Sequence, residues 1–162
     1  MSGFADSFLL FAAAVSACVH GTKVFLFSTH LRRISGAFHH GKAGNQPVII
    51  ADATQWGGGM RIGESLCTFV QQYGDRLLRE NTVVLIASDG LDTGDPGRLQ
   101  QAMEIIAART DLLIWLNPLL DIAGYEPSAI GMKTALPYIG LFTSENQPVS
   151  YRKLAERVRL WR

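Results

Sequence analysis

The chain begins with a block in which apolar side chains recur every third or fourth residue, the spacing of one buried helical face. This block predicts a helix over residues 4–19 that ends at His20-Gly21. Its buried face is predicted to consist of Phe4, Phe8, Phe11, Val15 and Val19. The apolar run is shorter than the ~20 residues of a membrane span, and residues 1–7 lack the basic charge of a secretion signal. A core helix is therefore favoured over a signal.

Further along, short apolar runs alternate with longer amphipathic ones. Strands are predicted at residues 23–28 and 31–35, joined as a hairpin at Thr29-His30, and at 83–88, 112–116 and 138–142. Helices are predicted at residues 61–79, at 97–109, from Tyr125-Glu126-Pro127 to about 136, and at 151–162. Pro96 is expected in the first turn of the second of these helices. The inward residues of the first are predicted to be Ile62, Leu66, Phe69, Val70 and Leu77. Residues 37–46 predict a helical fragment with a loop, residues 47–54 fit a strand or a helix, and residues 56–59 predict a flexible loop.

Alternating elements of this kind predict an α/β fold, a doubly wound, Rossmann-like and mostly parallel sheet with helices on both faces. We expect one domain over residues 1–162. Domains of this class begin with a strand, whereas this chain begins with a helix. The first, central strand is therefore expected to be missing and the domain to be incomplete at its N-terminus.

Composition narrows the function classes. The chain has 162 residues, 48% of them hydrophobic and 18% charged, which indicates a globular protein. Its net charge of +1 gives no overall attraction to nucleic acid or to an anionic membrane. The terminal helix has a basic face, which is expected to be solvated rather than to bind nucleic acid. Cys18 and Cys67 lie far apart in apolar runs, which indicates reduced, buried cysteines in a cytoplasmic protein.

The strongest candidate for chemistry is Asp89, which follows directly on the continuously apolar strand at residues 83–88. Ligands of such sheets bind beyond the carboxyl ends of the strands, and Asn117 ends the next strand at the equivalent place. Asp89 could instead bind backbone N–H groups of the adjoining loops, and this alternative stays open. Asp92 is expected to be a solvated loop charge, and Asp95, before Pro96, the N-cap of the next helix.

Other catalytic patterns find little support. The glycine loop at residues 57–63 matches neither a phosphate-binding loop, since Glu64 stands where lysine is needed, nor the dinucleotide fingerprint. The four histidines all lie in the first quarter of the chain, and the adjacent pair His39-His40 would point apart. We expect no enzyme. The alternative is a small α/β enzyme or nucleotide-binding protein that uses Asp89.

Several segments together resemble a known family. They are Phe4–Phe8, Val24–Leu31, Trp56–Gly63, Ser88–Asp95 and Trp115–Leu119, followed by Gly124–Pro127. Their order and spacing are similar to the von Willebrand factor A (VWA) domain of CoxE-like proteins. The resemblance implies a VWA fold and a non-enzymatic interaction module. It also implies an association with MoxR-type AAA+ ATPases and with the maturation of metalloenzymes such as molybdenum-containing carbon monoxide dehydrogenase.

The family's hallmark is a metal-ion-dependent adhesion site (MIDAS), in which a DxSxS loop, a threonine and an aspartate hold Mg²⁺. Of these positions the resemblance leaves only Asp89, because Met1 follows the point where DxSxS would end and Met60 replaces the threonine. A thioether is too soft a ligand for Mg²⁺. The resemblance thus implies a degenerate site, and we expect no cofactor. The partner-binding face is predicted to comprise Gly58, Gly59, Met60, Asp89, Gly90, Asp92 and Asn117.

The sequence therefore predicts a cytoplasmic protein-binding or adaptor module, with a MoxR-type AAA+ ATPase as the expected partner. Neither nucleic acid nor a membrane is expected as a partner. An unpaired strand edge could add a strand from another chain or support a homo-oligomer. A fragment without activity of its own is the remaining alternative.

Overall fold

In the computed structural model, residues 2–35 and 59–144 are described. The predictions for residues 37–46 and 47–54, for the loop as far as Gly58 and for the helix at residues 151–162 lie outside these residues. The helices of the described part are α1 (Ser2–Cys18), α3 (Ile62–Phe69), the π-helical η2 (Val70–Gly74), α4 (Asp75–Leu77), α5 (Pro96–Arg109), the 3-10 helix η3 (Pro118–Asp121), α6 (Ile130–Ala135) and the 3-10 helix η4 (Leu136–Tyr138). The strands are β1 (Phe25–Phe27), β2 (Leu31–Arg33), β3 (Val83–Ala87), β4 (Leu112–Leu116) and β5 (Leu141–Thr143).

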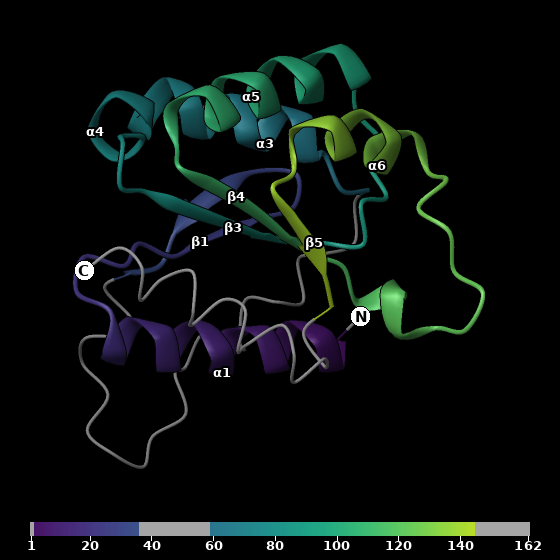
Figure 1. Ribbon diagram of the computed structural model, residues 1–162, viewed down its shortest axis with the longest axis horizontal. Coiled ribbons are helices and arrows are strands. Elements are labelled where there is room, and N and C mark those ends of the chain that lie inside the picture. The colour runs from purple at the N-terminus through teal and green to yellow at the C-terminus, as the bar shows by residue number, and fades with distance from the viewer. Residues whose placement is uncertain (1, 36–58, 145–162) are drawn as a thin grey trace.

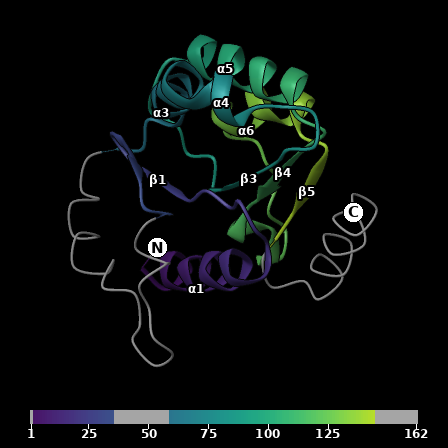
Figure 2. The same ribbon diagram turned by 90° about the vertical axis from the view of Figure 1, so that its left-hand side faces the viewer.

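Strands β3, β4 and β5 form a parallel sheet in that order. Helix α1 covers one face of this sheet, and α3, α5 and α6 cover the other (Figure 1). The view turned by 90° shows the same three layers (Figure 2). Strands β1 and β2 form the predicted antiparallel hairpin, with Phe25 opposite Arg33 and Phe27 opposite Leu31. The α/β class with helices on both faces of a parallel sheet is confirmed.

Burial explains why β4 is continuously apolar. All five of its residues are buried, since the strand has neighbours on both edges and helices on both faces. Trp115 and Leu113 pack under α3 and α5 with Ile62, Leu99, Met103 and Ile106. Leu112, Ile114 and Leu116 face α1, where Phe8 and Phe11 pack against them.

The predicted inward residues of the helix at 61–79 are confirmed, because Ile62, Leu66 and Phe69 are buried and Val70 and Leu77 pack against the same core. The first helix differs in detail. Among the α1 side chains that the structure describes, Leu9 and Ala12 are buried, whereas Val19, just after the helix, is 42% exposed. The inward placement of Val19 is therefore wrong: Val19 follows the last residue of α1 and is exposed, although its N–H still donates to the Val15 carbonyl at 2.8 Å.

The helix predicted up to residue 136 is shorter than expected. Helix α6 spans only Ile130–Ala135, and Ala129 before it has ψ near 143°, outside the helical region. At its other end Pro137 lies in the 3-10 turn η4, since proline lacks the N–H that a continuing helix would use.

Among the helices of residues 2–35 and 59–144, none combines the length and apolarity that a membrane crossing requires.

Candidate functional site

Strands β3 and β4 end at the same edge of the sheet. They pair in parallel from Val83 opposite Leu112 to Ala87 opposite Leu116. The backbone N–H of Ser88 continues this ladder by donating to the Leu116 carbonyl at 3.0 Å. The residues that follow, Asp89 and Asn117, therefore meet at the carboxyl edge, as the sequence predicted.

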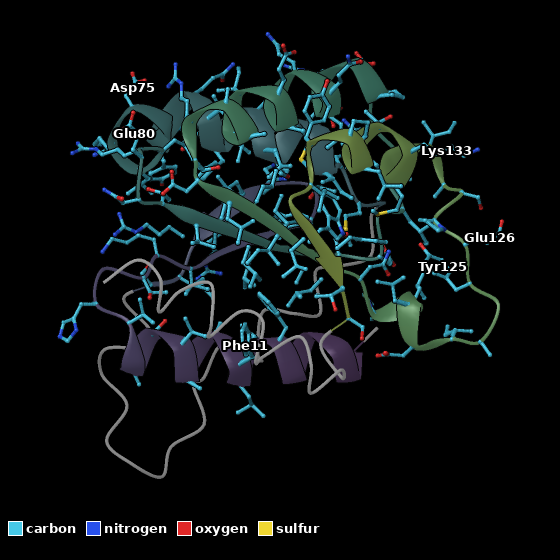
Figure 3. All side chains as sticks on the ribbon, in the orientation of Figure 1. Phe11, Asp75, Glu80, Tyr125, Glu126 and Lys133 are labelled. Carbon is cyan, nitrogen blue, oxygen red and sulfur yellow. The ribbon has the colours of Figure 1, made fainter. Side chains whose placement is uncertain are left out.

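Asn117 is the central polar residue of this edge. Its side chain is fully buried and makes three hydrogen bonds. Nδ2 donates to the Asp89 carbonyl oxygen at 3.2 Å and to the Tyr125 hydroxyl at 3.0 Å, while Oδ1 accepts from the Leu119 N–H at 2.8 Å. One amide thus joins the loop after β3, the first turn of η3 and the segment between η3 and α6. Figure 3 shows Tyr125 on that last segment, at the opposite end of the molecule from Asp75 and Glu80.

The carboxylate of Asp89 is turned into its own loop. The residue is 6% exposed, and its Oδ1 accepts from the Leu91 N–H at 3.0 Å. This contact corresponds to the alternative that the sequence left open, in which Asp89 binds backbone N–H groups beside it. Asp89 therefore shapes the loop that carries it, and little of the residue faces solvent.

Ser88 and Met60 pack against each other below this loop. Ser88 is 2% exposed, and its hydroxyl lies 3.4 Å from the Met60 sulfur while accepting from the Gly90 N–H at 3.1 Å. The Ser88 carbonyl accepts from the Trp115 indole N–H at 2.9 Å. The thioether at position 60 thus contacts a hydroxyl and the apolar core. The sequence analysis did not single out Ser88 or the Trp115 indole, because Ser88 contacts Met60 and the indole contacts Ser88, and the two residues of each pair are far apart in sequence.

Gly90 lets the loop turn tightly. Its φ is +77°, and a Cβ atom there would overlap the side chain of Met132, which is fully buried in α6. Only glycine meets both conditions, the positive φ and the close approach of a neighbouring side chain.

Asp92 corrects an expectation. It is half-buried rather than a solvated charge, and it fixes the start of α3. Its Oδ1 accepts from the N–H groups of Ile62 and Gly94 at 3.0 and 2.9 Å, and its Oδ2 accepts from Gly63 at 3.1 Å. A carboxylate at this place satisfies helix N–H groups that lack intrahelical partners and lies at the positive end of the helix dipole. The helix lies 30 residues upstream, so no local pattern could have predicted this cap.

The other residues of the loop are also tied down. Asp95 caps α5 as predicted, by accepting from the Gly97 N–H at 2.9 Å. Thr93 donates its N–H and its hydroxyl to the Met60 carbonyl, at 2.9 and 3.1 Å. Gly59 lies close to Thr93, since a Cβ atom on Gly59 would be 2.8 Å from the Thr93 hydroxyl oxygen. The loops from Gly59 to Met60 and from Asp89 to Asp95 are therefore in contact, whereas Gly58 lies outside the described residues.

Apolar side chains project beside these polar contacts. Leu91 is 55% exposed and Ile130 is 67% exposed. They lie on neighbouring segments, because Gly131 packs so closely on the Gly90 carbonyl and Asp92 that a Cβ atom there would collide with both. The sequence analysis named neither residue, since exposure of an apolar side chain follows from tertiary placement.

The described residues do not fit a magnesium site. Mg²⁺ requires oxygen ligands in an octahedral arrangement. Near Asp89 the structure offers an amide oxygen that already accepts from Leu119, a serine hydroxyl that contacts a thioether, and the Asp89 carboxylate, which accepts from the Leu91 N–H. Within residues 2–35 and 59–144, no three His, Cys, Asp or Glu side chains are grouped closely enough to hold a metal ion.

Comparison with known proteins supplies the family. The family model described as "VWA domain containing CoxE-like protein" matches residues 1–150, nearly the whole chain. The chain belongs to the CoxE-like VWA family. Searches of the curated proteins and of the solved structures give no match. The layered α/β arrangement of this CoxE-like VWA domain agrees with the fold that the family implies.

Proposed function

We propose that this CoxE-like VWA domain is a non-enzymatic adaptor that binds a protein partner at the carboxyl edge of its sheet without Mg²⁺. The observation that carries the proposal is the Asp89 carboxylate, which accepts from the Leu91 N–H instead of facing a partner. The predicted face of Gly58, Gly59, Met60, Asp89, Gly90, Asp92 and Asn117 is retained, with its residues acting mainly as a scaffold. We further propose a cytoplasmic location.

The scaffold supports this role by its rigidity. Asn117, Asp92 and Ser88 each join segments that are far apart in sequence, so the loops keep one arrangement before a partner arrives. Binding to a preorganised surface avoids the entropy cost of ordering loops. The carboxylates of Asp89 and Asp92 and the amide of Asn117 already have intramolecular hydrogen-bond partners. Most of the binding free energy is therefore expected to come from side chains that project outward.

Leu91 and Ile130 are the contact residues in this proposal. Apolar side chains that are more than half exposed and project from neighbouring segments can form the centre of an interface. We therefore extend the predicted face by these two residues, which we call the apolar rim. The partner is expected to present an apolar surface to the apolar rim rather than a metal-bound carboxylate.

For the partner we propose a MoxR-type AAA+ ATPase, in the service of metalloenzyme maturation. Family membership supports this choice, since CoxE-like VWA proteins are associated with such ATPases. The test is direct binding of the purified chain to a MoxR-type ATPase from the same organism, measured by biolayer interferometry in Mg²⁺ and again in EDTA without nucleotide.

The variants Leu91→Glu and Ile130→Glu place a charge on the apolar rim and are expected to weaken binding about tenfold or more. The matched control is Leu10→Glu, because Leu10 is 57% exposed, similar to Leu91, but belongs to α1, the helix on the face of the sheet opposite to α3, α5 and α6. Equal binding with and without EDTA is expected. Binding that disappears in EDTA refutes the metal-independent mode, and no binding in either buffer refutes the ATPase as partner.

A further inference from the structure

Two segments that carry the family resemblance meet at one hydrogen bond. The first, Trp115–Leu119, contains Asn117, and the second, Gly124–Pro127, contains Tyr125. Nδ2 of Asn117 donates to the Tyr125 hydroxyl at 3.0 Å and also to the Asp89 carbonyl at 3.2 Å. A single side-chain amide therefore links Tyr125 to the loop that carries much of the predicted partner-binding face.

The segment around Tyr125 crosses the carboxyl edge of the sheet. Residues 122–129 connect η3 to α6, and in Figure 1 they run past the carboxyl ends of the strands, from the side of α1 to the side of α6. Figure 3 shows Tyr125 and Glu126 on this segment. We call residues 122–129 the strap. Because ligands of such sheets bind beyond the carboxyl ends of the strands, the strap lies across the approach to that region.

The strap is held to the sheet at one point. The Tyr125 N–H donates to the Ile122 carbonyl at 3.1 Å and the Ser128 N–H to the Glu126 carbonyl at 2.7 Å, so these backbone hydrogen bonds stay within the strap. Across the part of the chain that the structure describes, the hydrogen bond that joins the strap to the sheet is the one between Asn117 and the Tyr125 hydroxyl.

Exposure and packing agree with this weak attachment. Ile122 is 58% exposed, and Ala123, Gly124, Glu126 and Ser128 are exposed as well. No strap residue belongs to the apolar clusters of the described core. Segments with few buried apolar contacts open at a lower free energy than the core of a protein. The hydrogen bond between Tyr125 and Asn117 is therefore the catch that keeps the strap closed.

The closed strap hides the Asn117 amide. Asn117 belongs to the predicted partner-binding face, yet its side chain is fully buried, and the Tyr125 hydroxyl occupies one of its N–H donors. The strap leads directly into Ile130, the first residue of α6 and one of the two residues of the apolar rim. A partner that settles on the apolar rim and extends toward Asn117 therefore meets the strap.

We propose that the strap is autoinhibitory and must lift, by release of the Tyr125 hydroxyl from Asn117, before the protein partner reaches the Asn117 amide. When the strap lifts, water replaces Asn117 at the Tyr125 hydroxyl, and an acceptor group of the partner replaces Tyr125 at Nδ2. This replacement is favoured because a buried N–H without an acceptor is costly. The inhibitory role rests on the proposed function, whereas the opening of the strap is a property of the chain alone.

Chymotrypsin provides the first test, because it cleaves after tyrosine and phenylalanine alike. The intact chain and Tyr125→Phe are digested under native conditions, and mass spectrometry follows cleavage between residues 125 and 126. Each rate is divided by that of a synthetic peptide of residues 119–132 with the same substitution. Cleavage tracks the open population when opening and closing are fast. Loss of the one hydrogen bond is expected to raise the normalised rate about fivefold.

Two controls accompany this digestion. Cleavage after Trp115, which is fully buried in β4, reports global unfolding and is expected to stay slow. Tyr138→Phe removes the hydroxyl of another half-buried tyrosine, which packs on the core in η4, and is expected to leave cleavage at residue 125 unchanged. Equal normalised rates in Tyr125→Phe and the unchanged chain refute the catch. Cleavage of the unchanged chain as fast as its peptide, or only in step with cleavage after Trp115, refutes a strap that opens locally.

The second test measures binding of the same three chains to the MoxR-type ATPase by biolayer interferometry. Apparent affinity falls with the fraction of the protein in its competent state, so Tyr125→Phe is expected to bind about fivefold more tightly than the unchanged chain. Tyr138→Phe is expected to bind as the unchanged chain does. Equal or weaker binding of Tyr125→Phe overturns the autoinhibitory role. If none of the chains binds, the proposed partner is refuted, and the cleavage rates alone decide whether the strap opens.

Discussion

The side-chain amide of Asn117 holds the loop of Asp89 in place, with Nδ2 3.2 Å from the Asp89 carbonyl oxygen. The contact joins residues 28 positions apart. It explains why the carboxyl ends of β3 and β4 form one surface rather than two independent loops. Asn117 acts through the backbone of Asp89, whereas the carboxylate of Asp89 serves its own turn.

Replacing Asn117 by alanine is expected to lower the free energy of unfolding by about 3 kcal/mol, because three hydrogen bonds are lost and a buried N–H and carbonyl remain unpaired. The measurement is urea denaturation followed by circular dichroism. Tyr125→Phe removes only the hydroxyl that accepts from Asn117 and should cost about 1 kcal/mol. Equal losses in the two variants would contradict the central role given to Asn117.

Asp92→Ala is expected to cost about 1–2 kcal/mol, since N–H groups at the start of α3 lose their acceptor and the favourable dipole interaction. Glu80→Ala is the control, because Glu80 is an exposed acidic residue at the far end of the molecule (Figure 3) and should change stability by less than about 0.5 kcal/mol. Both are measured by denaturant titration. If Asp92→Ala lowers the free energy of unfolding no more than Glu80→Ala does, Asp92 behaves as a solvated charge and does not stabilise the start of α3.

Gly90→Ala and Gly124→Ala separate backbone strain from steric overlap. Both glycines have positive φ, +77° and +78°, but a Cβ atom meets Met132 at Gly90 and nothing within 4 Å at Gly124. We expect Gly124→Ala to cost about 1 kcal/mol from the left-handed conformation alone. Gly90→Ala should cost about 3 kcal/mol, since overpacking is added. The comparison is made from thermal unfolding, and equal costs would show that Met132 moves aside freely.

Local patterns predicted much of this fold. Helical periodicity located α1 and the helical run that begins at Ile62, continuous apolar runs located β3 and β4, and Asp95 before Pro96 marked the start of α5. Each of these features is decided by residues within one or two turns. The boundaries that failed lie at Val19, one residue past the end of α1, and before Ile130, where Ala129 has a non-helical ψ.

The candidate site was predictable in position but not in its contacts. The carboxyl edge follows from parallel strands, so Asp89 and Asn117 could be placed together. Asp92, Ser88 and the Trp115 indole each have a hydrogen-bond partner 27–30 residues away. Sequence periodicity carries no information on such pairs, because they form only once α3 and β4 have packed against β3.

Metal dependence gives the last prediction. Mg²⁺ or Mn²⁺ at millimolar concentration is expected to leave the melting temperature unchanged, both in the chain and in Asp89→Asn. The asparagine variant keeps an oxygen for the Leu91 N–H but removes the charge, so it should fold normally. The variant Met60→Thr should also show no metal response, because Asp89 already accepts from the Leu91 N–H and Asp92 from the N–H groups of Ile62, Gly63 and Gly94. A ligand at a hundred times its Kd would stabilise the fold by about 2.7 kcal/mol, which thermal melting detects readily. Saturable calorimetric binding in the chain that is lost in Asp89→Asn would overturn the metal-free mode and restore Asp89 as a ligand.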